Sequence, residues 1–173
     1  MSDLSDSVLH EGIAVDLMFR TTRPEFGDLF TICGFDNPNF PPKSAMFAGV
    51  GALGFEQVDD YFGIKSESED GDDVVMWLFP LLDGEEAYHE PGPFEGVRLT
   101  FNVLRHPASR AARFVDVAKR MVLHLPVEVR IARRPVEPST LAAQLDENIR
   151  KIQDYWRQRG IECGSAEALA IEW

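Results

Sequence analysis

The sequence predicts an α+β domain with a mostly antiparallel sheet of about five or six strands and two long helices packed on it. Three observations lead to this class. Several short segments alternate apolar and polar residues, most of these segments follow one another without a helix between them, and two long segments near the C-terminus repeat apolar residues every three or four positions. The length of 173 residues is typical of a single globular domain, so we expect one domain over residues 1–173.

The first elements are a strand and a helix. Residues 13–21 alternate apolar and polar side chains, which indicates a half-buried strand. A helix is predicted from Pro24 to Cys33, because proline suits the first turn of a helix and Gly34 can end it. The polar, acidic residues 1–11 are expected to be a flexible N-terminal segment.

A hairpin is predicted next, from strands at residues 62–68 and 73–81. Asp70 and Gly71 between them form a dipeptide that favours a tight hairpin turn. Residues 35–54 are rich in glycine, proline and asparagine and are interpreted as a loop, as is the acidic stretch at residues 83–96.

The second half of the chain is predicted to run strand, helix, strand, helix. Residues 97–104 and 127–131 are the strands. The first helix follows Pro107, and its apolar stripe comprises Ala111, Phe114, Val115, Ala118, Met121, Val122 and Leu125.

The second long helix is predicted to begin near Ser139, a favourable N-cap, and to end at Gly160. Its apolar stripe comprises Leu141, Leu145, Ile149, Ile152 and Trp156. The tail ALAIEW, residues 168–173, is expected to add an edge strand.

Glycines 49, 51 and 54 have the G-x-G-x-x-G spacing of dinucleotide-binding loops. Such a loop needs a buried strand before it and a crossover helix after it. Pro41 and Pro42 leave room for only a short strand before Gly49, and the residues that follow predict a hairpin. We therefore interpret the glycines as a close-packed bend, and we expect no cofactor.

No metal site or catalytic residue is predicted. Cys33 and Cys163 lack a C-x-x-C partner, which favours reduced thiols. His106 and His124 are separated by 18 residues, so on one helix they lie too far apart to share a metal ion. The N-terminal residues lack the pattern of a secretory signal and the apolar runs are too short to span a bilayer, which favours a cytoplasmic protein.

Charge is distributed unevenly in this chain, whose formal net charge is −12. Residues 1–97 contain 20 acidic and 4 basic residues, a net charge of −16, whereas residues 98–173 contain 9 acidic and 13 basic residues, a net charge of +4. A strongly negative surface repels nucleic acid and anionic membranes and speeds the encounter with a basic partner. The alternative is that these acidic residues only form a solvated face.

We therefore expect a non-catalytic protein that binds, and inhibits, a basic protein. Small acidic α+β proteins of this kind are similar in general character to bacterial immunity proteins, which block the active site of a toxin. The predicted partner-binding residues are Glu67, Glu69, Asp70, Asp72, Asp73, Asp83, Glu85, Glu86, Tyr88, His89 and Glu90. Candidate apolar anchors are Trp77, Tyr88, Phe94 and Trp156.

The alternative hypothesis is an enzyme or carrier for a small anionic ligand. Basic residues gather in the sequence around the end of a strand and the first turns of the next helix, where backbone amides also favour an anion. The residues of this candidate anion site are Arg98, Arg105, His106, Arg110 and Arg113. The other interpretation of these residues is internal pairing with the acidic half of the chain.

Overall fold

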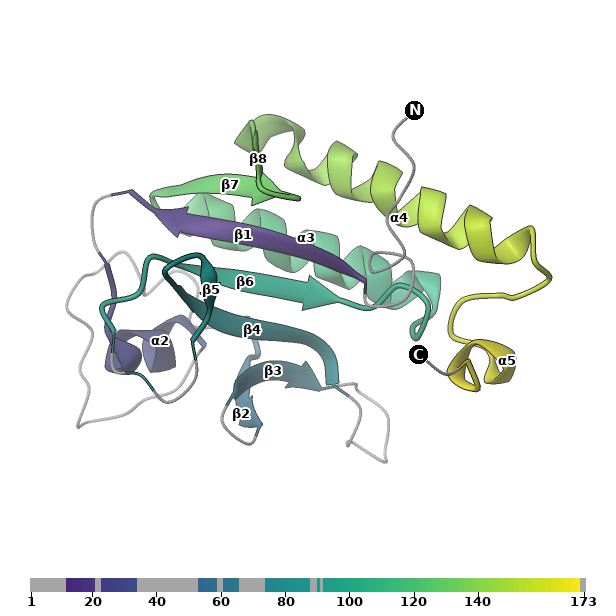
Figure 1. Ribbon diagram of the computed structural model, residues 1–173, viewed down its shortest axis with the longest axis horizontal. Helices are drawn as coiled ribbons and strands as arrows, with labels where there is room; N and C mark the ends of the chain where they lie inside the picture. Colours follow the sequence, from purple (N-terminus) through teal and green to yellow (C-terminus); the bar gives the residue numbers. More distant parts are fainter. Residues whose placement is uncertain are drawn as a thin grey trace.

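The computed structural model describes residues 12–20, 23–33, 53–58, 61–65, 74–87, 90 and 92–171 (Figure 1). The strands are β1 (Ile13–Phe19), β2 (Glu56–Val58), β3 (Tyr61–Lys65), β4 (Val74–Leu82), β5 (Glu85–Glu86), β6 (Gly96–Phe101), β7 (Val127–Ile131) and β8 (Arg134–Val136). The helices are α2 (Phe26–Ile32), α3 (Ala108–His124), α4 (Leu141–Arg157) and α5 (Ala166–Leu169), with a 3-10 turn at Pro138–Thr140 before α4.

The eight strands form one sheet in the order β2-β3-β4-β6-β1-β7-β8, with β5 paired to the end of β4. Every described pairing is antiparallel. In the centre, Leu17 of β1 lies opposite Val97 of β6 and Val129 of β7, so these apolar side chains share one face. The class and the antiparallel sheet agree with the prediction, but the sheet has more strands than the five or six expected.

One face of the sheet is covered by helices and holds the core. Helix α3 lies behind the strands in Figure 1, and α4 packs against α3. Phe114 of α3 stacks on Phe101 of β6 with ring centroids 5.2 Å apart. The buried α4 residues are Leu141, Leu145, Ile149, Ile152 and Trp156, the stripe that the sequence predicts. Helices α2 and α5 also place buried residues in this core, for example Leu29 and Ala168.

Two tight turns produce strands that the sequence analysis did not predict. Asp83 and Gly84 both have positive φ, 54° and 79°, and they join β4 to β5 inside the stretch interpreted as loop. Ala132 and Arg133, with φ of 52° and 67°, join β7 to β8 in the same way. Positive φ at both central residues is the mark of the type I′ hairpin turn, whose twist suits paired strands.

The ends of the C-terminal elements differ in part from the prediction. Ser139 does not cap α4, because it lies within the 3-10 turn and α4 begins at Leu141. Gly160 does end the helix: its φ is +76°, and the N–H of Ile161 donates to Trp156 O, as in a Schellman motif. Residues 168 and 169 of the predicted edge strand lie instead in helix α5, because the Ser165 side chain accepts from the Ala168 N–H and caps a helical turn, and residues 172–173 lie outside the described residues.

The glycine pattern lies only partly in the described chain. Gly49 and Gly51 are outside the described residues, whereas Gly54 has φ of +92° and is followed by strand β2. A dinucleotide loop would continue into a helix and a parallel strand. The predicted turn at Asp70–Gly71 and the N-terminal segment 1–11 also lie outside the described residues.

Candidate binding face of the sheet

The face of the sheet turned away from the core, called here the open face, carries three neighbouring aromatic side chains. Tyr61, Trp77 and Phe79 are half-buried, and none of them belongs to the described core. The ring centroid of Tyr61 lies 5.9 Å from Trp77 and 5.2 Å from Phe79, and the centroids of Trp77 and Phe79 are 6.1 Å apart. We call these three residues the aromatic corner.

Strand alternation and register explain why the rings meet. Phe62 of β3 pairs with Leu78 of β4, and both point into the core. Tyr61, Trp77 and Phe79 flank this pair, so they project to the open face. The apolar run from Val74 to Leu82 therefore places apolar side chains on both faces of the sheet. Because nearly every residue of this strand is apolar, the sequence does not show the alternation that would distinguish the two faces.

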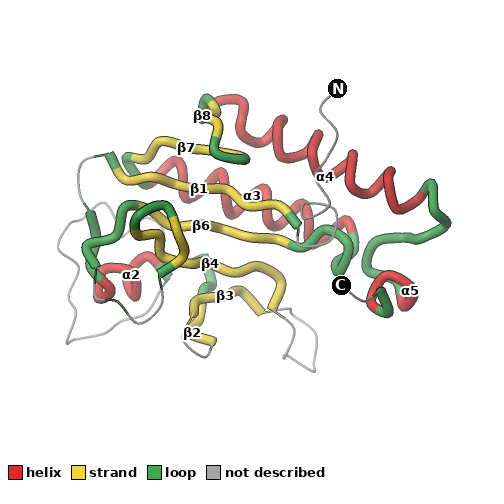
Figure 2. Tube along the Cα trace, in the orientation of Figure 1, coloured by secondary structure: helices red, strands yellow, loops and turns green. Residues whose placement is uncertain are grey.

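An acidic loop, whose described residues are 83–87, 90 and 92–95, follows β4 at the same end of the sheet. Its backbone is anchored: the N–H groups of Ala87, Phe94 and Glu95 donate to Pro80 O, Pro24 O and Leu81 O at 2.8, 2.8 and 2.9 Å. Phe94 is fully buried, so its ring fixes the loop to the core. Figure 2 shows this loop beside α2, as the contact with Pro24 requires.

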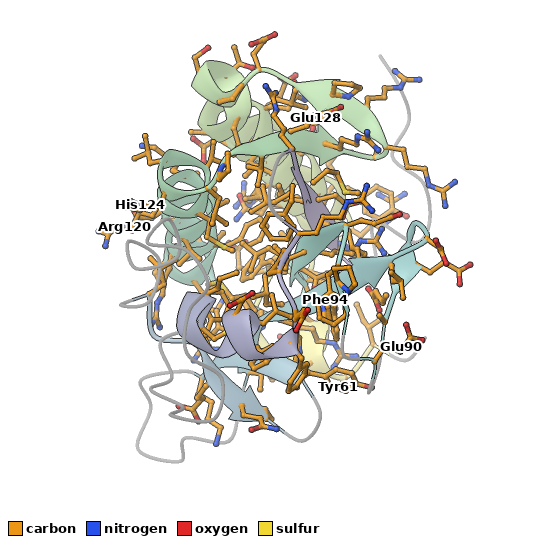
Figure 3. The ribbon with its side chains drawn as sticks, turned by 90° about the vertical axis from the view of Figure 1, so that its left-hand side faces the viewer. Tyr61, Glu90, Phe94, Arg120, His124 and Glu128 are labelled. Carbon is orange, nitrogen blue, oxygen red and sulfur yellow. The ribbon has the colours of Figure 1, made fainter. Side chains whose placement is uncertain are left out.

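The anchored loop presents carboxylates to solvent. Asp83, Glu85 and Glu90 are exposed, whereas Glu95 accepts a hydrogen bond from the Gly84 N–H at 3.3 Å. Glu86 lies opposite Leu81, two residues along β4 from Phe79, which places it next to the aromatic corner. Figure 3 shows Glu90 and Tyr61 on one side of the sheet and residues of α3 on the other.

The remaining predicted partner-binding residues lie outside the described part of the chain. They are Glu67, Glu69, Asp70, Asp72, Asp73, Tyr88 and His89. Of the candidate apolar anchors, Trp77 lies on the open face, whereas Phe94 and Trp156 are buried in the core and cannot insert into a partner. Tyr61 and Phe79 were missed by the sequence analysis. The uninterrupted apolar run of β4 could have indicated them, because an antiparallel strand with one solvent-exposed face normally alternates apolar and polar residues.

Arg98 of β6 lies between two carboxylates on the open face. Its Nε and Nη2 donate to Asp16 Oδ1 and Oδ2 at 2.7 and 3.1 Å, and its Nη1 lies 3.5 Å from Glu86 Oε1. The hydrogen bond to Asp16 raises the pKa of the guanidinium, while partial burial acts in the opposite direction. Arg98 thus joins the acidic loop to the central strands.

The candidate anion site is not assembled into one cluster. Arg98 projects to the open face, whereas α3, which carries Arg110 and Arg113, covers the other face. Arg105 donates to Leu169 O and Ile171 O at 2.9 and 3.1 Å and so holds the tail. His106 is buried, stacks on Phe101 and contacts Arg110 Nη1 through Nδ1 at 3.1 Å. Arg98 pairs with acidic residues of the first half of the chain, as the internal-pairing interpretation expects, whereas the printed partners of Arg105 are backbone oxygens of the tail.

Helix α3, on the helix side of the sheet, is basic. Helix α3 carries Arg110, Arg113, Lys119 and Arg120 against a single acid, Asp116. Figure 3 shows Arg120 and His124 pointing away from the sheet on this side. The order of the strands explains why acidic and basic residues lie in different parts of the molecule. The acidic first half of the chain forms β2 to β5 at one end of the sheet, and the basic second half forms β7, β8 and the long helices.

The described side chains form no group of three or more His, Cys, Asp or Glu residues placed to hold a metal ion. Both cysteines are free and buried. Burial raises the pKa of Cys33 well above its ordinary value, and it also raises the pKa of Cys163. None of the described helices has the length and apolar character needed to cross a bilayer.

Comparison with known protein families and with curated protein sequences gives no match.

Proposed function

We propose that this protein is a non-catalytic binding protein that engages a basic protein partner through the acidic loop and inhibits it. The specific form that we favour is a bacterial immunity protein that neutralises a toxin. In this proposal the carboxylates of Asp83, Glu85 and Glu90 occupy a cationic site where the partner would otherwise hold an anionic substrate.

The observation that carries the proposal is the combination of a fixed backbone and exposed carboxylates in one loop. Buried Phe94 and the backbone hydrogen bonds from Ala87, Phe94 and Glu95 to Pro80, Pro24 and Leu81 anchor the loop at its two described ends. A preorganised loop loses less conformational entropy on binding, so more of its interaction energy contributes to affinity. A negative surface also accelerates association with a basic partner.

The alternative, an enzyme or carrier with an anion site, has less support. Arg98 already donates to Asp16 in a bidentate pair, and both terminal nitrogens of Arg105 donate to backbone oxygens of the tail. An anion would have to displace these acceptors.

Charge-reversal variants test the proposal. The loop variant is Asp83→Lys, Glu85→Lys and Glu90→Lys, and the matched control is Glu137→Lys, Asp146→Lys and Glu167→Lys, exposed acids elsewhere with the same total change in charge. Both are used with the wild type as bait in pull-downs from the native cell at low and high salt. We expect the wild type and the control to retain the same basic protein at low salt, and the loop variant to lose it.

Two results would overturn the proposal. If the loop variant retains the partner as well as the wild type does, the acidic loop is not the binding site. If the loop variant and the control weaken binding equally, only net charge matters and the proposed site is wrong. Inhibition is then tested by adding the protein to the purified partner and measuring the partner's activity.

A further inference from the structure

We propose that the aromatic corner binds an arginine side chain of the basic partner, with the guanidinium stacked on Trp77. This inference rests on the proposed function, because it assigns the partner's chemistry at the surface beside the acidic loop. It extends that function from a general electrostatic attraction to recognition of one kind of side chain.

The geometry of the corner suits a planar cation. Trp77 and Phe79 are nearly parallel, with an interplanar angle of 15°, whereas Tyr61 meets them at 87° and 73°. The rings therefore form two walls at close to a right angle on neighbouring strands. All three are half-buried, so each retains surface that a ligand can contact. Tryptophan offers the strongest cation–π surface among the aromatic residues.

The charges around the corner favour a cation. Glu86 and Asp16 both lie beside Arg98, and the described cation on β3, Lys65, pairs with Glu56 at 3.2 Å. The exposed carboxylates of the acidic loop, Glu85 among them, follow directly from β4. An incoming guanidinium would therefore find aromatic faces and carboxylates on one surface, without an unpaired basic side chain described beside it.

Arginine fits this surface better than lysine does. The guanidinium is flat and weakly hydrated, so it stacks on a ring with less loss of hydration than an ammonium group. A guanidinium stacked on an aromatic ring already occurs in this protein: the guanidinium carbon of Arg159 lies 3.5 Å from the ring centroid of Tyr155. A lysine side chain would retain the attraction to the carboxylates but lose the stacking.

Peptide binding to the full chain tests the inference. The probes are an oligo-arginine peptide and an oligo-lysine peptide of equal length, and the dissociation constants are measured by calorimetry at one salt concentration. The indole N–H signals of the three tryptophans are followed by NMR, with Trp77 assigned from a Trp77→Phe variant. Trp156 is buried and serves as the internal control.

We expect the arginine peptide to shift the Trp77 signal and to leave the Trp156 signal unchanged. Trp77→Leu, which keeps an apolar side chain but removes the π surface, should weaken binding of the arginine peptide about tenfold and weaken the lysine peptide less, because an ammonium group loses only its cation–π attraction and no stacking. Thermal melting of the variant checks that the sheet is intact. A Trp77→Leu variant that is folded and binds both peptides as the wild type does would overturn the inference, and equal affinity of the two peptides for the wild type would also overturn it.

The loop variant separates this inference from the proposed function. If the loop variant loses both peptides while Trp77→Leu loses neither, the acidic site stands and the arginine site is wrong. If Trp77→Leu loses the arginine peptide while the loop variant binds both peptides as the wild type does, the arginine site stands and the acidic site is wrong. If the wild type binds neither peptide, the arginine site is wrong, and the pull-down with the loop variant decides the proposed function separately.

Discussion

Replacing Arg98 by alanine should destabilise the fold more than removing any exposed ion pair. Arg98 and Asp16 form a bidentate pair whose side chains are only 23 % and 14 % exposed, and Glu86, at 26 %, is the third member. Without the guanidinium, two half-buried carboxylates lose their hydrogen bonds to Arg98. The loss should also loosen the acidic loop, because Glu86 is one of its residues.

The size of the effect follows from the degree of burial. Breaking a fully buried ion pair by removing one partner costs about 3–5 kcal/mol, and partial solvent access reduces this here to roughly 2 kcal/mol. For a chain of this length, about 2 kcal/mol corresponds to a fall in melting temperature of roughly 4–8 °C. The matched control is Arg120→Ala on α3, whose pair with Asp116 is 60 % and 54 % exposed. Such exposed helix pairs contribute only about 0.2–0.5 kcal/mol.

Differential scanning calorimetry at neutral pH measures both variants against the wild type. We expect Arg98→Ala to melt several degrees below Arg120→Ala. Equal melting temperatures for the two variants would show that the Asp16–Arg98–Glu86 contacts do not stabilise the sheet, and the reasoning from burial would be refuted.

Three further predictions concern local structure. In urea unfolding, Gly160→Ala should lower the free energy of unfolding by about 1 kcal/mol, because alanine disfavours the positive φ at this position. Gly164→Ala should lower it further, because the new Cβ would also lie 2.6 Å from Pro107 N. A thiol reagent at mildly alkaline pH should not modify Cys33 until the protein unfolds, since burial raises its pKa and blocks access. Arg130 lowers the pKa of Glu128 in the folded protein, so ionised Glu128 stabilises the fold. Glu128→Gln should therefore have a lower free energy of unfolding than the wild type at neutral pH, and this difference should disappear as the pH falls through the lowered pKa.

The elements with strong periodicity could be predicted from the sequence. The stripe of α4 from Leu141 to Trp156 and the alternation in β1 and β7 each bury one clear face, and the structure confirms them. The short strands β5 and β8 could not be predicted in this way. Asp83–Gly84 is a dipeptide that favours a hairpin turn, but it lies in an acidic stretch that was interpreted as a loop. Ala132–Arg133 gives no such signal, because neither residue favours positive φ.

The candidate site was predictable only in part. The acidic residues of the loop are visible in the sequence, but their fixation depends on Phe94 reaching the core, which requires the tertiary structure. Tyr61 joins Trp77 and Phe79 only through the register of β3 against β4. Arg98 and Arg110 are close in sequence, yet the first faces the open side of the sheet and the second belongs to the helix that covers the core. When two residues belong to different elements, their distance in the sequence does not predict which face of the sheet each one occupies.

The sheet order gives the molecule a charge polarity that bears on its binding. Strands β2 to β5, from the acidic half of the chain, lie at one end with the acidic loop, while α3 places Lys119 and Arg120 on the helix side. A basic partner is therefore attracted to one end of the molecule and repelled by another. This asymmetry would orient the partner before the side chains of the open face make contact.

Hydrogen–deuterium exchange of the full chain, with and without the basic partner captured in the pull-down, tests the proposed binding site most directly. We predict that the partner slows exchange in β4, β5 and the acidic loop and leaves α3 and α4 unchanged. Slower exchange confined to α3 and α4, with the acidic loop unaffected, would contradict the proposal that this loop and the aromatic corner form the binding face.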